Sequence, residues 1–272
     1  MRHKLGLKPV TEQPRLRLAN YLKPSDLPNI KDLTFPFGHA AAITPQMFCN
    51  DRLGDCAIAG SIEEVRLANA LRGVTVNFDD QAAIENYSAI TGYDPDDPDS
   101  DQGTDVHELY DYRKKTGIKD ADGNYHKIIA YAGLTPGNFN ELLIALWLFD
   151  MVGIGIQVPD FCDAQFEAGQ AWHLERGRHT IEGGHYIPIV GAPDRDVVQL
   201  YTWGANQGMT EPFYATYNTV ACVALTAELF SNDKSPEGLD MEKLARDLPE
   251  LNTGPVMAKA PRQRKRTKPE AA

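Results

Sequence analysis

Apolar residues recur at helical spacing in the first half of the chain and in short, partly alternating runs in the second half. The clearest helical pattern covers residues 56–73. It has Ile58, Ile62 and Val65 among its apolar positions and ends at a glycine, which is a common stop signal. We therefore expect a helix that carries Cys56 at its N-terminus. Two further helices are predicted, at residues 80–90 and 105–115.

The pattern changes to strands from about residue 127. Short apolar runs are bounded there by glycine, proline, asparagine or aspartate, as is typical of strands. One helix is expected to interrupt them, from Thr135 to Phe149, with Pro136 in its first turn. Helices first and strands later predict an α+β architecture of two lobes with a cleft between them. Four strands are predicted, at residues 153–158, 186–190, 197–203 and 220–225.

The two ends of the chain differ from its body, residues 27–230. Residues 1–26 are rich in proline and basic side chains and lack a sustained period, so we expect an extended arm laid over the body. Residues 231–250 have the pattern of an amphipathic C-terminal helix, and residues 251–272 that of a basic tail without compact structure. The basic residues of this tail are Lys259, Arg262, Arg264, Lys265, Arg266 and Lys268.

Charge and composition narrow the range of partners. The chain carries a formal net charge of −11, and its body is more acidic still, because the tail holds much of the positive charge. An acidic body does not favour the binding of nucleic acid. Only the basic tail has the positive charge needed to contact phosphates. No apolar run is long enough to cross a bilayer, and the chain starts without the apolar core of an export signal. We therefore expect a cytoplasmic protein with no membrane partner.

Two patterns raise the question of a disulfide or a metal site. Cys49 and Cys56 are close enough in sequence to pair or to bind a metal ion, but their spacing is not that of a zinc motif. An acidic stretch also matches five positions of an EF-hand-like frame: Asp97, Asp99, Asp101, Asp105 and Glu108. Gln102 stands where such a loop needs glycine, so an acidic loop that caps the next helix is the favoured interpretation. We expect no metal ion and no cofactor.

One cysteine and one histidine stand in a context that favours nucleophilic chemistry. Cys56 lies at the predicted helix start, where unpaired amides and the helix dipole favour a thiolate, and Gly54 allows a close turn before it. His185 follows two glycines at the start of a predicted strand, and an imidazolium there would pair with the thiolate. Asp55 would raise the pKa of the thiol unless its carboxylate points to solvent.

These residues resemble the papain-like cysteine peptidases. Cys56, then His185, then Trp203-Gly204 follow the order of that superfamily, at close to the expected interval of roughly 130 to 150 residues between cysteine and histidine. The stretch Ala41-Ala42-Ile43-Thr44-Pro45 is similar to the one that leads to its active-site loop. The resemblance covers roughly residues 27–230. It implies a two-lobed fold, with a helical left lobe and an antiparallel β right lobe, and a thiol protease that hydrolyses peptide or amide bonds of a polypeptide.

The resemblance also implies roles for single residues. Cys56 would attack the carbonyl carbon, and His185 would accept and return the proton. Asn50 takes the place of the oxyanion-hole glutamine and would share the oxyanion with the backbone N–H of Cys56. The asparagine that orients the histidine is replaced by Tyr201, whose hydroxyl has a different reach, and Asn206 would serve only if its turn folds back. The residues expected to bind substrate are Gly103, Gly184 and Trp203.

Two functions stay open at this point. The first is a papain-like cysteine hydrolase, for which isopeptide cleavage or transamidation would use the same residues. The second is a catalytically degenerate papain-like protein with a structural or assembly role, for example in a virion, whose arm and basic tail bind neighbouring proteins. The replaced asparagine and the missing pro-segment fit the second function. The lack of a signal and of a pro-segment favours a bacterial or phage origin, with virion association as the alternative to the cytoplasm.

Overall fold

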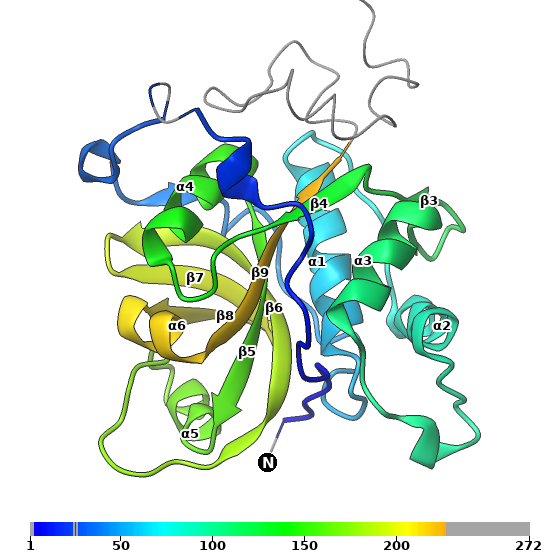
Figure 1. Cartoon of the computed structure of the whole chain (residues 1–272). Coiled ribbons are helices and arrows are strands. Elements are labelled where there is room, and N and C mark those ends of the chain that lie inside the picture. Colours follow the sequence, from blue (N-terminus) through cyan, green and yellow to red (C-terminus); the bar gives the residue numbers. More distant parts are fainter. Residues whose placement is uncertain (1–2, 24, 26, 227–272) are drawn as a thin grey trace, which may run out of the picture.

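The computed structural model describes residues 3–23, 25 and 27–226 of the chain (Figure 1). A group of helices stands beside an antiparallel sheet, and the N-terminal segment runs along the junction between them. This arrangement confirms the predicted α+β class. The helix predicted at residues 231–250 and the basic tail at residues 251–272 lie outside the described residues. Within the described part of the chain, no helix is long and apolar enough to span a membrane.

Three helices make up the first lobe: α1 (Cys56–Ala70), α2 (Asp80–Thr91) and α3 (Val106–Lys115). All three were predicted, and aspartate caps fix where two of them begin. The Asp79 carboxylate accepts the N–H of Ala82 at the start of α2. The Asp105 carboxylate accepts the N–H groups of His107 and Glu108 at the start of α3. Such caps satisfy amides that have no acceptor within the helix.

The second lobe is built on one seven-stranded antiparallel sheet. Its strands are β1 (Phe37–Gly38), β4 (Ala130–Gly133), β5 (Val152–Pro159), β6 (Ile181–Asp194), β7 (Val197–Thr202), β8 (Ala205–Thr210) and β9 (Asn218–Leu225). Neighbouring strands follow the order β4, β9, β5, β6, β7, β8, and β1 also pairs with β6. A separate small sheet joins β2 (Ile118–Lys119) to β3 (Tyr125–His126). The predicted strands are present as β5, β6, β7 and β9, whereas β1, β4 and β8 of this sheet and the two short strands β2 and β3 were not predicted.

The remaining helices are α4 (Phe139–Phe149), α5 (Cys162–Glu167) and α6 (Glu211–Tyr217). Helix α4 begins later than predicted, because the Asn138 side chain caps it by accepting the N–H of Glu141. Pro136 therefore precedes the helix and does not occupy its first turn. Helices α5 and α6 were not predicted, since each spans about two turns or less and leaves little periodicity to read. Single 3-10 turns lie at Leu18–Asn20, Ile30–Asp32 and Pro98–Ser100.

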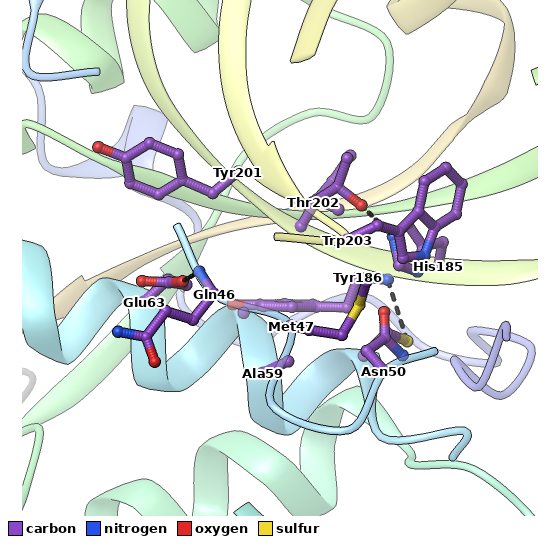
Figure 2. Close-up of a pocket in the computed structure, with 13 residues that line it drawn as sticks. Gln46, Met47, Asn50, Ala59, Glu63, His185, Tyr186, Tyr201, Thr202 and Trp203 are labelled. Carbon is purple, nitrogen blue, oxygen red and sulfur yellow. Dashed lines mark hydrogen bonds between the residues drawn. The ribbon is translucent and has the colours of Figure 1, made fainter. Parts of the chain in front are cut away.

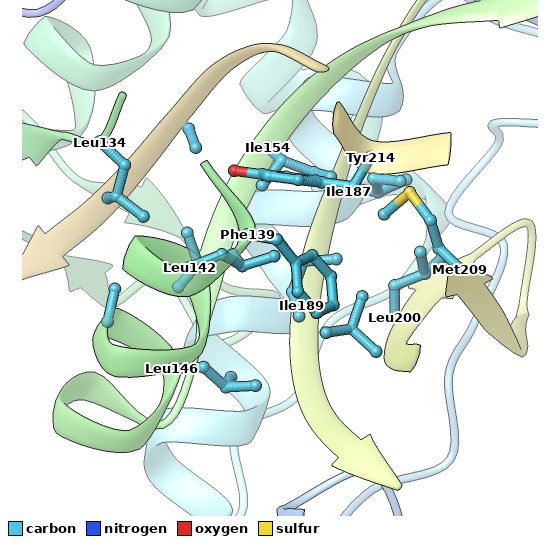
Figure 3. Packing of buried hydrophobic residues seen from close by; sticks show 14 of the residues in the cluster. Leu134, Phe139, Leu142, Leu146, Ile154, Ile187, Ile189, Leu200, Met209 and Tyr214 are labelled. Atoms are coloured by element: carbon cyan, nitrogen blue, oxygen red, sulfur yellow. The ribbon is translucent and has the colours of Figure 1, made fainter. Parts of the chain in front are cut away.

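Each lobe has its own hydrophobic core. In the β lobe, Phe139, Leu142 and Leu146 of α4 pack on the sheet (Figure 3). They meet buried strand residues that include Ile154, Ile187, Ile189 and Leu200. In the helical lobe, the core gathers around α1 and α3 and includes Ile58, Ile62 and Leu109, none of which is exposed. Tyr186 of β6 belongs to this second core, so the sheet contributes to both.

The lobes meet where α1 lies against β6. A methyl group on Gly60 would lie 2.7 Å from Cδ1 of Tyr186, so glycine allows the close approach. The Tyr186 hydroxyl donates to Glu64 of α1 at 2.6 Å. Arg113 of α3 forms an ion pair with the same carboxylate at 2.7 Å, and the Tyr110 hydroxyl is 2.8 Å from that of Tyr186. Arg113 and Glu64 are both 3% exposed in their side chains, so their opposite charges offset one another away from water.

Replacing Arg113 with methionine should destabilise the protein strongly. The variant leaves the Glu64 carboxylate buried without its cation, and we expect the free energy of unfolding to fall by about 3–5 kcal/mol. Urea unfolding followed by circular dichroism measures it. The double variant Glu64→Met/Arg113→Met removes both charges and should recover much of the loss. Equal losses in the two variants would show that the ion pair does not matter to the junction.

Candidate active site

Cys56 is the first residue of α1, and its sulfur meets β6. The backbone N–H of Tyr186 donates to Cys56 Sγ at 3.4 Å (Figure 2). This hydrogen bond puts the thiol next to His185, which precedes Tyr186 in β6. Cys56 and His185 line one small cavity between the lobes. The fold thus brings together the two residues that the sequence singled out.

A chain of hydrogen bonds fixes the turn before Cys56. The Asp101 carboxylate accepts the N–H of Gly54 through both oxygens, each at 3.1 Å. The Tyr87 hydroxyl donates to Asp101 at 2.6 Å and accepts the N–H of Gly103 at 2.9 Å. Tyr87 is fully buried and the Asp101 side chain is 7% exposed, so water competes little for these bonds. Sequence reasoning missed this link, because it joins three loops that are far apart along the chain.

His185 is held by Thr202, the last residue of β7, and by Trp203, which follows it. Its Nε2 lies 2.7 Å from the Thr202 hydroxyl, and its ring stacks on Trp203 with centroids 4.8 Å apart. The residue is 1% exposed. Its Nδ1 is buried and has no hydrogen-bond partner within the described residues. A ring fixed through one nitrogen keeps the other available to exchange a proton.

Thr202, and not Tyr201, is therefore the residue that the structure brings to His185. The Tyr201 hydroxyl donates to the carbonyls of His39 and Ala40, both at 3.2 Å, and points away from His185 in Figure 2. Neighbouring residues of a strand face opposite sides of the sheet, so only one of the two can reach the imidazole. Counting positions from Trp203 selected Tyr201. The alternation along β7 is the signal that identifies Thr202.

The expected oxyanion residues lie in the turn that precedes α1. The Asn50 amide donates to the Leu53 carbonyl at 3.2 Å and to the Asp55 carboxyl at 3.3 Å. Asn50 also lines the small cavity with Cys56 and His185. Its N–H groups are engaged within the turn, so contact with an oxyanion requires Asn50 to exchange a partner. The backbone N–H of Cys56 lies in the first turn of α1, where amides lack an acceptor within the helix.

Asp55 is fully buried and does not point to solvent. Burial raises the pKa of its carboxyl well above the usual range, while the hydrogen bond from Asn50 lowers it. One carboxyl oxygen has no hydrogen-bond partner among the described residues. The turn before Cys56 thus holds a carboxyl group whose ionisation is disfavoured by burial.

The N-terminal segment occupies the cleft over Cys56. Leu7 forms bridges to Gly184 on one side and to Thr104 on the other. The Gly184 carbonyl accepts the N–H groups of Gly6 and Leu7, and the Thr104 N–H donates to the Gly6 carbonyl at 2.7 Å. The backbone N–H of Gly6 is also near enough to Cys56 to lower the pKa of its thiol. The Gly6 carbonyl accepts from Thr104, so this carbonyl is engaged by the wall of the cleft.

All three residues expected to bind substrate contact this arm. Gly184 forms the bridge to Leu7, and a methyl group on Gly103 would overlap the Gly6 carbonyl. Trp203 stacks on the ring of His3 with centroids 4.1 Å apart. The sequence predicted an arm laid over the body, but it did not predict that the arm lies in the cleft over Cys56. The arm fills the groove in the place where a peptide substrate is expected.

Burial keeps both reactive groups neutral in this state. Desolvation raises the pKa of the Cys56 thiol to about 12, against the hydrogen bonds from Tyr186 and Gly6, which lower it. Desolvation also lowers the pKa of His185 to about 3, with a smaller effect of His3 in the same direction. At neutral pH the pair is a thiol and a neutral imidazole. Burial in this structure therefore disfavours the expected thiolate and imidazolium.

The alternative sites considered from the sequence do not assemble. All four cysteines are buried free thiols, so Cys49 and Cys56 form no disulfide. No group of His, Cys, Asp or Glu residues within the described part of the chain is arranged to hold a metal ion. Asp101 binds Gly54 and Tyr87, and Asp105 caps α3. These carboxylates of the acidic loop thus accept hydrogen bonds from amides and a hydroxyl group of the chain itself.

Comparison with solved structures identifies the fold. No protein-family model matches the sequence, and no curated protein matches it. Xylellain, a cysteine protease from Xylella fastidiosa, matches with a TM-score of 0.61 at 15% identity, over 83% of this chain and 98% of xylellain. The Carica candamarcensis cysteine protease CMS1MS2 matches with a TM-score of 0.52 at 13% identity, over 71% of this chain and 99% of that protease.

A procathepsin B from Trypanosoma congolense gives a TM-score of 0.52 at 8% identity, over 81% of this chain and 85% of that chain. These likenesses span both lobes. The chain therefore has the fold of papain-like cysteine proteases, with a helical region beside an antiparallel sheet. Such low identity shows the fold and leaves the chemistry of the site to be argued from its own residues.

Cys56 should resist alkylation in the native chain. A rise of the thiol pKa from its ordinary 9.0 to about 12 lowers the thiolate fraction about a thousandfold at any pH below 9, and the arm blocks access as well. Site-resolved mass spectrometry after iodoacetamide treatment at pH 8 measures the rate. The chain unfolded in urea supplies the control, since all of its thiols are then exposed. Equal rates for Cys56 in folded and unfolded chains would contradict the closed geometry.

Proposed function

We propose that this chain is a papain-like cysteine hydrolase that cleaves peptide or amide bonds of a polypeptide. The supporting observation is the imidazole of His185, which Thr202 holds at Nε2, which has no partner for Nδ1 among the described residues, and which lines the same small cavity as Cys56. Xylellain and CMS1MS2 are described as cysteine proteases, and the shared fold supports the same class of reaction. A nucleophile, a base and a residue that orients the base are the parts that such a reaction needs.

The reaction proceeds through a thioester. Cys56 Sγ attacks the substrate carbonyl carbon, a C–S bond forms, and the thiol proton passes to Nδ1 of His185. The imidazolium gives this proton to the leaving nitrogen as the C–N bond breaks and the amine departs. Water then attacks the thioester with His185 as base, and the proton returns to the sulfur as the acid leaves. Thr202 keeps the ring in place throughout, and the N–H of Cys56 stabilises the oxyanion.

The arm-bound form is the resting state in this proposal. The segment around Gly6 and Leu7 fills the groove, and burial keeps the thiol and the imidazole neutral. Departure of the arm admits water and substrate, which removes the desolvation that shifts both pKa values. One ion pair that holds the arm on the body is partly exposed to water, which favours its dissociation. Lys4 pairs with Asp101 at 3.4 Å, and 48% of the Lys4 side chain is exposed.

Replacing Leu7 with aspartate should open the site. Leu7 is 6% exposed and packs in the apolar core of the helical lobe, so a carboxylate there disfavours the bound arm. Alkylation of Cys56 by iodoacetamide should become at least about tenfold faster than in the native chain. Thr11→Asp is the matched control, because Thr11 is an exposed arm residue and should leave the rate unchanged. No difference between the two variants would mean that the arm does not close the site.

Catalysis should depend on three residues of the site. In the Leu7→Asp chain, Cys56→Ala and His185→Ala should each lower kcat on unfolded casein by at least about 100-fold. Thr202→Val removes the partner of Nε2 and should lower kcat about tenfold, as expected for one lost hydrogen bond. His173→Ala, at an exposed histidine, should leave the rate unchanged. Casein fragments that persist in the Cys56→Ala chain would contradict the proposed nucleophile.

The alternative is a catalytically degenerate protein with a structural or assembly role. The burial of Cys56 under the arm favours it, because a closed cleft needs no working nucleophile. An arm-released chain that leaves casein intact would select this alternative. A cytoplasmic or virion-associated location, and binding of proteins through the two ends of the chain, stay predictions.

A further inference from the structure

The cleft over Cys56 is narrowest where Gly6 passes through it. A methyl group on Gly6 would overlap the carbonyl of Gly54, and one on Gly103 would overlap the carbonyl of Gly6. A methyl group on Gly54 would lie 3.4 Å from the Cα of Gly6. Backbone atoms, which cannot rotate away as a side chain can, therefore form both walls. We refer to the space between Gly54 and Gly103 as the slot.

The width of the slot is set by the hydrogen bonds that join its two walls. Gly54 N–H binds Asp101, Asp101 accepts from Tyr87, and Tyr87 accepts from Gly103 N–H. Each link is 3.1 Å or shorter, and Tyr87 is fully buried. To widen the slot, at least one of these hydrogen bonds must break where no water replaces it, which is unfavourable. The walls thus resist opening for a larger residue.

The slot lies at the reactive sulfur. Gly54, one wall of the slot, is two positions before Cys56, and the backbone N–H of Gly6 is near enough to Cys56 to lower the pKa of its thiol. His185 follows Gly184, whose carbonyl accepts the N–H of Gly6, and its buried Nδ1 has no hydrogen-bond partner among the described residues. A substrate residue that brings its carbonyl carbon to the sulfur has to occupy the slot. Its Cα then lies between the same two glycines.

The residues on each side of Gly6 are both leucines with apolar contacts. A methyl group on Gly183 would lie 3.1 Å from Leu5, so Leu5 packs against that strand. On the other side, a methyl group on Gly155 would crowd Leu7, and Leu7 shares a core with Val220. The cleft is therefore shaped for aliphatic side chains before and after the slot and for none within it.

We propose that this cleft selects glycine at the position that faces Cys56, with aliphatic residues as its neighbours. The substrate class is then polypeptides that carry an aliphatic-Gly-aliphatic segment. Tyr87 is a positioning residue for this selectivity, because its hydroxyl links the two walls without touching the substrate. The inference rests on the proposed hydrolase function, but its first test depends only on how the arm fits.

Gly6→Ala in the full chain tests the slot without any activity. If alanine cannot enter, the arm leaves, and iodoacetamide should alkylate Cys56 at least about tenfold faster than in the native chain. Thr11→Ala is the control in an exposed part of the arm. Adding Tyr87→Phe to Gly6→Ala removes the link between the walls, lets alanine in and should restore much of the protection. Protection equal to the native chain in Gly6→Ala alone would overturn the proposal, since the slot would then accept alanine.

Selectivity towards a substrate is tested in the Leu7→Asp chain with two peptide vinyl sulfones. One carries Leu-Gly and the other Leu-Ala next to the reactive group. Labelling of Cys56 should be at least about tenfold faster with the glycine compound, and Tyr87→Phe should reduce this ratio. Equal rates would overturn the glycine preference. Failure of the hydrolase itself gives a different result: the reactivity of Cys56 towards iodoacetamide would not change in His185→Ala.

Discussion

The close contact between α1 and β6 is the constraint on which the site depends. Gly60 lets the helix approach the ring of Tyr186, and the Tyr186 hydroxyl reaches Glu64 one turn further along α1. The same strand residue donates its N–H to Cys56 at the start of the helix. Tyr186 of β6 therefore binds α1 at two points along the helix. His185 is positioned with it, because it is the preceding residue of the same strand. The buried pair of Glu64 and Arg113 ties α3 to the same junction.

Much of this fold could be predicted from the sequence, because long periodic segments such as α1 carry their own signal. The residues Cys56 and His185 also stood out, since a thiol at a helix start and a histidine after two glycines have local meaning. Local patterns did not identify the partner of His185. The structure shows that this partner is Thr202, because Tyr201 faces the opposite side of the strand. The arm in the cleft was equally out of reach, because its bonds to Gly184 and Thr104 join segments far apart in the chain.

The N-terminal arm in the cleft bears on the reactivity of Cys56 and His185. Burial in the closed cleft raises the pKa of the Cys56 thiol and lowers that of His185, which disfavours a charged pair of the two groups. The same arm holds its Gly6 carbonyl on Thr104, away from the sulfur, and so is not aligned for attack. In the proposed function, the occupant of the groove thus controls both the access to Cys56 and the ionisation of Cys56 and His185. The backbone atoms on both sides of Gly6 also limit which residue can occupy the cleft next to Cys56.

The most direct test is the pH dependence of Cys56 alkylation in the Leu7→Asp chain, with and without His185. The account predicts fast alkylation below about pH 7 that disappears in His185→Ala, because only a thiolate paired with an imidazolium reacts at such pH values. A curve that follows an ordinary thiol, identical in both chains, would contradict it. In that case Cys56 and His185 would be neighbours in a papain-like fold without acting together.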